Sequence, residues 1–295
     1  MSNLLPEPLP EARAFPVFPA APVCFEDCIE SDQFDIYKLL SLSAMREKRS
    51  TGDQHEYLKS FSKLLSSRLS VLRQPCFSWQ IGETQYHSTS MLFELYNSCL
   101  SLAQQIFNAA GDYKASVHLL QQCQQLLKAW KTSDLVYPTC PFVCTQEYIT
   151  DMLHLTRGAM LLRLRGGPQR ANALSSAMKF SGMVSFHLPH YSEVALNHYL
   201  VARALLFRHL AKEEVEQGDA ANESYAAGKE ALALCQLVDR TKCHVDGALD
   251  DELNGLLREL PEHLRTMEQV YYAVEVPLEN LKLPASLRND KIKAR

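Results

Sequence analysis

The sequence predicts an all-α fold, an elongated and curved helical solenoid of antiparallel, tetratricopeptide-like hairpins. Apolar residues recur at helical spacing from about residue 31 onward, and no segment shows sustained strand alternation bounded by hairpin turns. At most one short extended pairing is expected, near the N-terminus. Gly111-Asp112 and Gly218-Asp219 each end one long helix and open another, with glycine for the tight turn and aspartate for the cap. The two breaks define no 34-residue period, which indicates an irregular solenoid.

The N-terminal segment is predicted to be extended, because residues 1–23 hold six of the 14 prolines. Pro16/Pro19 and Pro19/Pro22 have Pro-x-x-Pro spacing, so this segment either lies against the domain or offers an SH3-type ligand. We therefore divide the chain into a Pro-rich segment (1–30), a single helical domain (31–285) and a basic C-terminal tail (286–295).

The helices are placed in order along the chain. The first has Asp32 as its N-cap and buries Phe34, Tyr37, Leu40 and Ala44. Apolar residues from Tyr57 to Leu72 predict a second helix, which Pro75 ends. The others are expected at about 91–111, 114–130, 145–164, 170–186, 191–216, 220–238 and 250–275, separated by glycine- or proline-containing breaks.

Composition excludes several classes of function. The 295 residues carry a net charge of −4 and a pI near 6.2, which argues against a nucleic-acid partner. No run of about 18 apolar residues or secretory leader is visible. The nine cysteines are an odd number, and several fall within helical patterns, which predicts free thiols in a reducing cytoplasm.

Catalytic and metal motifs are weak. No Gly-rich phosphate loop occurs, and no cysteine is marked as a nucleophile beside an oriented histidine, so we expect no enzyme and no cofactor. Cys24/Cys28 and Cys140/Cys144 have the inner spacing of a zinc pair, yet neither has a matching second pair. No metal site is predicted.

Two sequence motifs resemble the Bro domain family of endosomal-sorting scaffolds. The first comprises Phe77-Ser78-Trp79, Ser88, Phe93-Glu94 and Asn97, and the second runs from Val270-Tyr271-Tyr272 to Pro277. The resemblance covers about residues 60–285 and implies structural roles for Phe77, Trp79, Phe93, Glu94, Asn97, Tyr271, Tyr272 and Pro277. The chain departs from the family pattern at Leu153–Met160 and at Met267-Glu268-Gln269.

The resemblance implies a rigid helical scaffold that binds the amphipathic C-terminal helix of an ESCRT-III-type subunit in an apolar groove. Residues 177–207 are more apolar than one buried face requires, which fits either such a groove or a middle layer buried on two sides. The groove candidates are Phe180, Met183, Val184, Leu196, Tyr199 and Leu200.

A peripheral membrane contact is a further expectation. Arg46, Lys48, Arg49, Lys59, Lys63 and Arg68 would form either a face for anionic endosomal lipid or an ordinary solvated surface. The sequence thus predicts a non-enzymatic, cytoplasmic and peripherally endosomal adaptor. The alternative is a tetratricopeptide-like scaffold unrelated to endosomes, for example in a cytoskeletal assembly.

Overall fold

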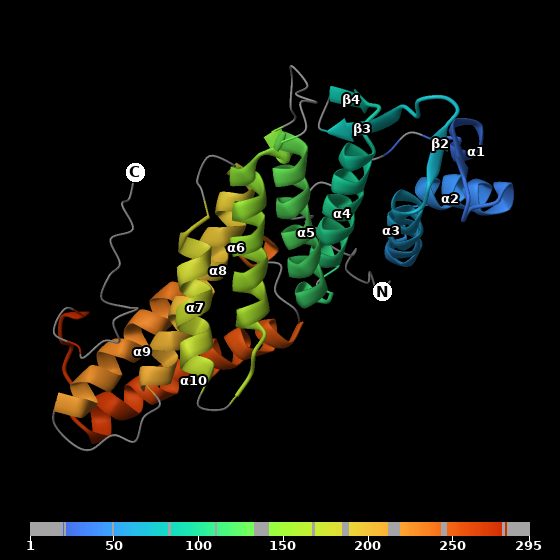
Figure 1. Cartoon of the computed structure of the whole chain (residues 1–295). Helices are drawn as coiled ribbons and strands as arrows, with labels where there is room; N and C mark the ends of the chain where they lie inside the picture. Colours follow the sequence, from blue (N-terminus) through green and yellow to red (C-terminus); the bar gives the residue numbers. More distant parts are fainter. Residues whose placement is uncertain are drawn as a thin grey trace, which may run out of the picture. The chain divides into compact units, whose positions relative to one another are not determined.

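The chain folds into a succession of helices, with short β-strands in its N-terminal half (Figure 1). The computed structural model describes residues 20, 22–48, 50–81, 84–109, 111–132, 142–166, 169–184, 189–211, 219–242, 247–278 and 281. The helices are α1 (Phe25–Cys28), α2 (Ile36–Glu47), α3 (Thr51–Ser66), α4 (Met91–Asn108), α5 (Tyr113–Thr132), α6 (Gln146–Leu162), α7 (Arg170–Gly182), α8 (Pro189–Ala211), α9 (Asp219–Leu237) and α10 (Gly247–Val270). Two 3₁₀ turns, η1 (Phe142–Cys144) and η2 (Arg240–Lys242), connect longer helices. The predicted all-α class is confirmed.

Two compact units make up the chain, one of residues 15–153 and one containing residues 154–295. The division falls within α6, whereas the sequence predicted a single domain over 31–285. In the first unit α2 packs on α3, α3 on α4 and α4 on α5. In the second, α7 packs on α8, α8 on α9 and α9 on α10. Each unit is therefore a row of helices in which sequence neighbours are spatial neighbours.

Two short antiparallel sheets interrupt the helices of the first unit. β1 (Ile29–Ser31) pairs with β2 (Leu69–Val71), and β3 (Phe77–Ile81) pairs with β4 (Thr84–Ser88). The first pairing matches the expected extended contact near the N-terminus. The β3–β4 hairpin was not predicted, because its five-residue strands are too short to show a clear alternation. The helix predicted over Tyr57 to Leu72 was too long, since α3 ends at Ser66 and Leu69 begins a strand.

Residues 22–31 belong to the core of the first unit. Val23, Phe25 and Ile29 are buried among side chains of α2 and α3, and α1 and β1 lie within the segment that was predicted to be extended. Phe25 lies 5.7 Å from Phe61 and 6.1 Å from Phe77 between ring centroids. This part of the N-terminal segment therefore packs as core. Residues 1–19, which hold five of the six prolines of this segment, lie outside the described residues.

Helix α2 buries the face opposite to the one that its periodicity predicted. Its N-cap is Asp35 and not Asp32, and the Asp35 side chain accepts from Lys38 N at 2.9 Å. Leu39 and Leu42 are buried, whereas Tyr37 is 79% exposed and Leu40 is also exposed. The reason is Arg46, whose buried side chain fixes the inward face of the helix.

A buried carboxylate, Glu94 of α4, joins four elements of the first unit. Arg46 of α2 donates to both of its oxygens, at 2.8 Å from Nε and 2.9 Å from a terminal nitrogen. The Tyr57 hydroxyl of α3 and the Trp79 indole N–H of β3 each donate at 2.7 Å, and Ser98 donates at 3.3 Å. A fully desolvated carboxylate is stable only when it is paired and hydrogen-bonded, and this one has both kinds of partner.

The electrostatics of this network keep its partners in their donating forms. Burial acts to lower the pKa of the Arg46 guanidinium, but the Glu94 charge and the interactions with Glu94 and Tyr57 together outweigh it, so the pKa is raised. Burial first, and then the Glu94 charge, raise the pKa of Tyr57 well above its usual range. The Arg46 guanidinium also lies over the rings of Phe77 and Trp79, 5.8 and 5.6 Å from their centroids. The Bro-like motif residues Phe77, Trp79 and Glu94 therefore have a shared structural role.

The other two motif residues of α4 stabilise the helix and its core. Phe93 is buried, and its backbone N–H is capped by the Ser90 hydroxyl at 3.4 Å. Asn97 is fully buried and donates to the Phe93 carbonyl at 2.9 Å. These contacts support a structural assignment for both residues.

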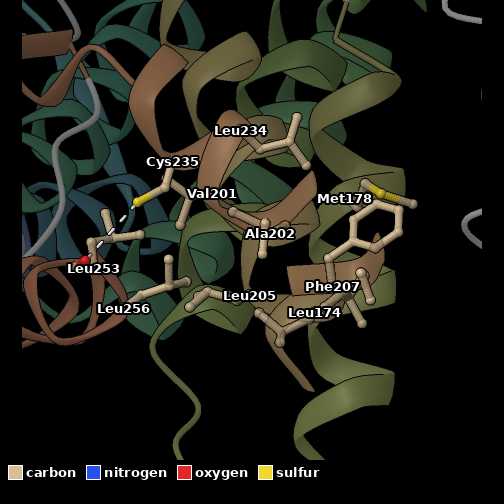
Figure 2. Close-up of a cluster of buried hydrophobic side chains, with 14 of the residues drawn as sticks. Leu174, Met178, Val201, Ala202, Leu205, Phe207, Leu234, Cys235, Leu253 and Leu256 are labelled. Atoms are coloured by element: carbon tan, nitrogen blue, oxygen red, sulfur yellow. Dashed lines mark hydrogen bonds between the residues drawn. The ribbon is translucent and has the colours of Figure 1, made fainter. Parts of the chain in front are cut away.

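The second unit has a large apolar core (Figure 2). Leu174 and Met178 of α7 meet Phe207 of α8, while Leu253 and Leu256 of α10 close the opposite side. The Cys235 thiol lies 4.0 Å from the Leu253 carbonyl, and burial raises its pKa. Cys235 thus behaves as a small apolar side chain, as its position in a helical pattern indicated.

Replacing Glu94 tests the network. Glu94→Gln should lower the free energy of unfolding by about 3 kcal/mol or more, because the buried Arg46 charge loses its counterion. Chemical denaturation followed by tryptophan fluorescence measures the change. Glu56→Gln, an exposed α3 carboxylate paired with Lys59 at 3.7 Å, is the control and should cost less than about 1 kcal/mol. Equal effects of the two variants would contradict the assignment.

His263 of α10 should make the second unit sensitive to acid. Burial lowers its pKa, and its Nε2 lies 3.3 Å from the Ser224 hydroxyl. Below about pH 6.5 the unfolded histidine binds a proton that the folded one resists, so stability falls as the pH is lowered. Unfolding at about pH 7.5 and 5.5, followed by far-UV circular dichroism, should show a smaller loss in His263→Gln than in the exposed-site control His209→Gln.

Candidate functional site

The C-terminal motif forms a turn that reverses the chain against α9. Helix α10 ends at Val270, before the two tyrosines and not at about residue 275 as predicted. Tyr271 packs on a cluster that includes Tyr225 and Met267. Tyr272 has a φ of 55°, and its side chain is 83% exposed. The Ala273 N–H donates to the Met267 carbonyl at 3.0 Å, which closes the turn.

Beyond this turn the segment 273–278 is fastened to α9 by polar contacts. The Val274 N–H donates to Asn222 Oδ1 at 2.8 Å, and Lys229 Nζ binds Glu275 at 2.5 Å. This hydrogen bond from Glu275 raises the pKa of Lys229. Val276 and Leu278 then pack against the core of the second unit. The segment is therefore held by both hydrogen bonds and apolar contact.

A hollow of about 410 Å³ lies between α9 and this segment. Ala226 and Ala233, two turns apart on α9, leave the space that larger side chains would fill. Pro277 lines the opposite wall, so the motif residue contributes to a surface as well as to the turn. The charges at its edge are balanced, since Lys229 binds Glu275 and Glu230 lies 3.6 Å from Arg203. This hollow was not predicted, because it forms only when the chain reverses after Val270.

The six predicted groove residues lie at the end of α7 and just after it, at 180–184, and on α8, at 196–200. The two helices pack together here, since a Cβ on Gly182 would lie 3.9 Å from the Tyr199 ring. Val184 and Tyr199 are buried, so they belong to the core and do not line an open groove. Met183 is 49% exposed and Leu196 is 45% exposed, while Phe180 and Leu200 are half-buried.

These exposures divide the six residues into an accessible set and a supporting set. We use the name α7–α8 patch for the four accessible residues Phe180, Met183, Leu196 and Leu200, whereas Val184 and Tyr199 are buried. The Tyr199 hydroxyl accepts from Arg203 at 3.1 Å, which fixes the ring. The patch thus offers apolar side chains on a rigid support. Met183 is the C-cap of α7, whereas the sequence predicted that this helix continues to about residue 186.

Phe180 connects the patch to α6. Its ring lies 5.9 Å from the His154 ring, and the Arg157 guanidinium lies 5.8 Å from its centroid. Both neighbours come from one face of α6, at spacing i and i+3. Gly158 on this helix allows the close approach of α7, because a Cβ there would lie 2.9 Å from the Ser181 hydroxyl. Sequence reasoning named Phe180 but missed Arg157.

One of the six residues predicted for the basic face, Arg46, is not on the surface. Arg46 is buried against Glu94, so it cannot contact a membrane. Lys48, Lys59, Lys63 and Arg68 are exposed, and Arg49 lies outside the described residues. Lys48 lies 3.7 Å from Asp53, so part of the remaining charge is locally paired.

The described ranges contain neither a cluster of metal-ligating side chains nor a helix that could span a membrane. Within them, no group of three or more His, Cys, Asp or Glu side chains is arranged to hold a metal ion. Cys140, one of the four cysteines considered for zinc, lies outside them. The same part of the chain contains no helix with the length and apolar character needed to cross a bilayer.

Comparison by sequence identifies no relative: no known family model and no curated protein matches this chain. Comparison of the folds finds similar structures. ALIX, solved in complex with the SIVmac239 PYKEVTEDL late domain, aligns with a TM-score of 0.54 and 14% identity over 90% of this chain. The alignment covers 46% of the ALIX chain, so this chain spans about half of that protein's length.

A Bro1 domain, solved in a study of endosomal targeting by that domain, aligns with a TM-score of 0.51 and 12% identity. The alignment covers 90% of this chain and 87% of the Bro1 chain. Both neighbours support a divergent Bro-domain-like fold, which confirms the resemblance drawn from the two sequence motifs.

Substitution of Tyr272 tests the turn that carries the second motif. Tyr272→Gly should raise the free energy of unfolding by up to about 1 kcal/mol, because glycine adopts a positive φ without steric cost. Tyr272→Ala removes the same exposed side chain but retains the strained backbone, so it should not stabilise the protein. Thermal unfolding followed by circular dichroism compares the two variants. A stabilising alanine variant would show that the side chain, and not the φ angle, is responsible.

Proposed function

We propose that this protein is a non-enzymatic endosomal-sorting scaffold that binds the amphipathic C-terminal helix of an ESCRT-III-type subunit. The observation that carries the proposal is the exposed α7–α8 patch within a Bro-domain-like fold. The ALIX neighbour was solved with a bound late-domain peptide, which supports peptide recognition as a use of this fold.

The physical chemistry of the patch suits a helical ligand. An amphipathic helix presents apolar side chains at i, i+3, i+4 and i+7 to an apolar surface. Met183 and Leu196 offer accessible apolar surface, and methionine adapts its shape to different partners. The neighbouring residues Val184 and Tyr199 are buried, so little ordering is required when a ligand binds.

The proposal extends to location. A cytoplasmic protein that binds an ESCRT-III-type subunit would be recruited to the endosomal surface by that partner. The exposed basic residues Lys48, Lys59, Lys63 and Arg68 support an additional weak attraction to anionic lipid, worth about 1 kcal/mol for each residue near the surface.

A binding titration tests the proposed partner. The labelled C-terminal helix of an ESCRT-III subunit should raise its fluorescence anisotropy saturably with the full-length protein, with a Kd in roughly the micromolar range. Met183→Asp and Leu196→Asp should each weaken binding by about tenfold or more, because each places a charge in the apolar contact. Both residues are half-exposed, so their substitution should leave the fold intact.

Leu237→Asp is the matched control. Leu237 is 67% exposed on α9 of the same unit, so this variant introduces the same charge away from the patch. It should bind as the wild type does. Failure of the helix to bind the wild-type protein would reject the ESCRT-III partner, and would favour a helical scaffold with another class of ligand, such as a cytoskeletal assembly.

A further inference from the structure

We propose that Arg157 and Lys179 form a cationic border of the α7–α8 patch, which selects a helix carrying carboxylates beside its apolar anchors. This inference rests on the proposed function, because it assumes that a helix binds the patch. The inference specifies the charge of the bound helix and names the residues that would bind that charge.

Arg157 is held in position without a carboxylate. Its guanidinium lies over the Phe180 ring, 5.8 Å from the centroid, and the side chain is half-buried. In the described part of the chain, Arg157 has no acidic partner within ion-pair distance. An aromatic ring orients a guanidinium through its face and leaves the edge N–H groups available as donors. Arg157 is therefore an oriented donor next to an apolar residue of the patch.

Lys179, the residue before Phe180 in α7, adds a second cation. It is exposed in the last turn of α7, and it precedes Met183 by four residues. Residues at i and i+4 share one face of a helix, so Lys179 and Met183 lie on the same face. Among the described residues, no carboxylate forms an ion pair with Lys179. The patch thus combines apolar groups with two positive charges.

Two described carboxylates of the same unit are already engaged. Glu193, one turn before Leu196 on α8, lies 3.2 Å from Lys242 Nζ. Glu230 of α9 pairs with Arg203 beside the Tyr199 hydroxyl. Glu193 and Glu230 thus form ion pairs, whereas among the described residues no carboxylate pairs with Arg157 or Lys179 of the same unit. Charge complementarity therefore favours an acidic partner.

The occupant that fits this arrangement is an amphipathic helix with carboxylates flanking its apolar stripe. Apolar anchors three and four residues apart would contact Met183 and Leu196, and glutamates one turn away would reach Arg157 or Lys179. Such border charges affect specificity and association more than total affinity. Their effect should weaken with salt, because exposed charges are screened.

The test uses two synthetic helical peptides with identical leucine anchors at i, i+3, i+4 and i+7. One carries glutamate at the flanking positions and the other carries glutamine. Anisotropy titrations with the full-length protein at about 50 mM salt should show the glutamate peptide binding about fivefold tighter, with the difference largely lost at about 500 mM. The Arg157→Gln and Lys179→Gln double variant should bind both peptides equally.

Arg265→Gln is the control, because Arg265 is an exposed α10 residue of the same unit. This variant alters the net charge without altering the border, so it should retain the preference for glutamate. Equal binding of the two peptides by the wild type, or a preference that survives in the double variant, would overturn the inference while leaving the helix-binding function in place. Binding of neither peptide, nor of the ESCRT-III helix, would reject both.

Discussion

The buried Glu94 carboxylate is the interaction on which the first unit depends. It lies on α4, but its donors come from α2, α3 and β3, which are up to 48 residues away in sequence. Removing a charge from water is costly unless every partner is in place, so the helices on either side are fixed in register. Replacing the whole network with apolar groups could preserve stability but would lose this directional constraint. Phe77 and Trp79 are then positioned by the arginine as much as by their own packing.

The second unit is organised by apolar packing and by the reversal after α10. The α7–α8 patch depends on the buried Tyr199 and Val184, and the α9 hollow depends on the segment that returns beside Asn222 and Lys229. Both surfaces are therefore consequences of core packing. The accessible residues contribute little to the fold, which leaves their chemistry free to serve recognition.

Helical periodicity and glycine breaks were sufficient to predict the fold class and most helices. The Asp112 cap was predicted correctly, since its side chain accepts from the Lys114 and Ala115 N–H groups at 3.0 and 3.1 Å.

Errors arose where a partner far away in the sequence determines which side chains are buried. A buried arginine reversed the face of α2, because periodicity assigns a charged residue to the surface. Arg157 was not predicted as a site residue for the same reason, because its position depends on contact with Phe180, 23 positions further along the chain. Phe180, Met183 and Leu196 could be named from the family resemblance and the apolar excess of residues 177–207, but their exposure required the packing of α7 on α8.

The position of Trp79 also determines what intrinsic fluorescence can report. The chain has two tryptophans, Trp79 and Trp130, and both belong to the unit of residues 15–153. The Trp79 indole is buried and donates to the Glu94 carboxylate, so its emission will change when that network opens. The unit that carries the α7–α8 patch contains no tryptophan. No tryptophan in this unit reports its unfolding, so a native emission spectrum does not show whether the proposed binding surface is folded.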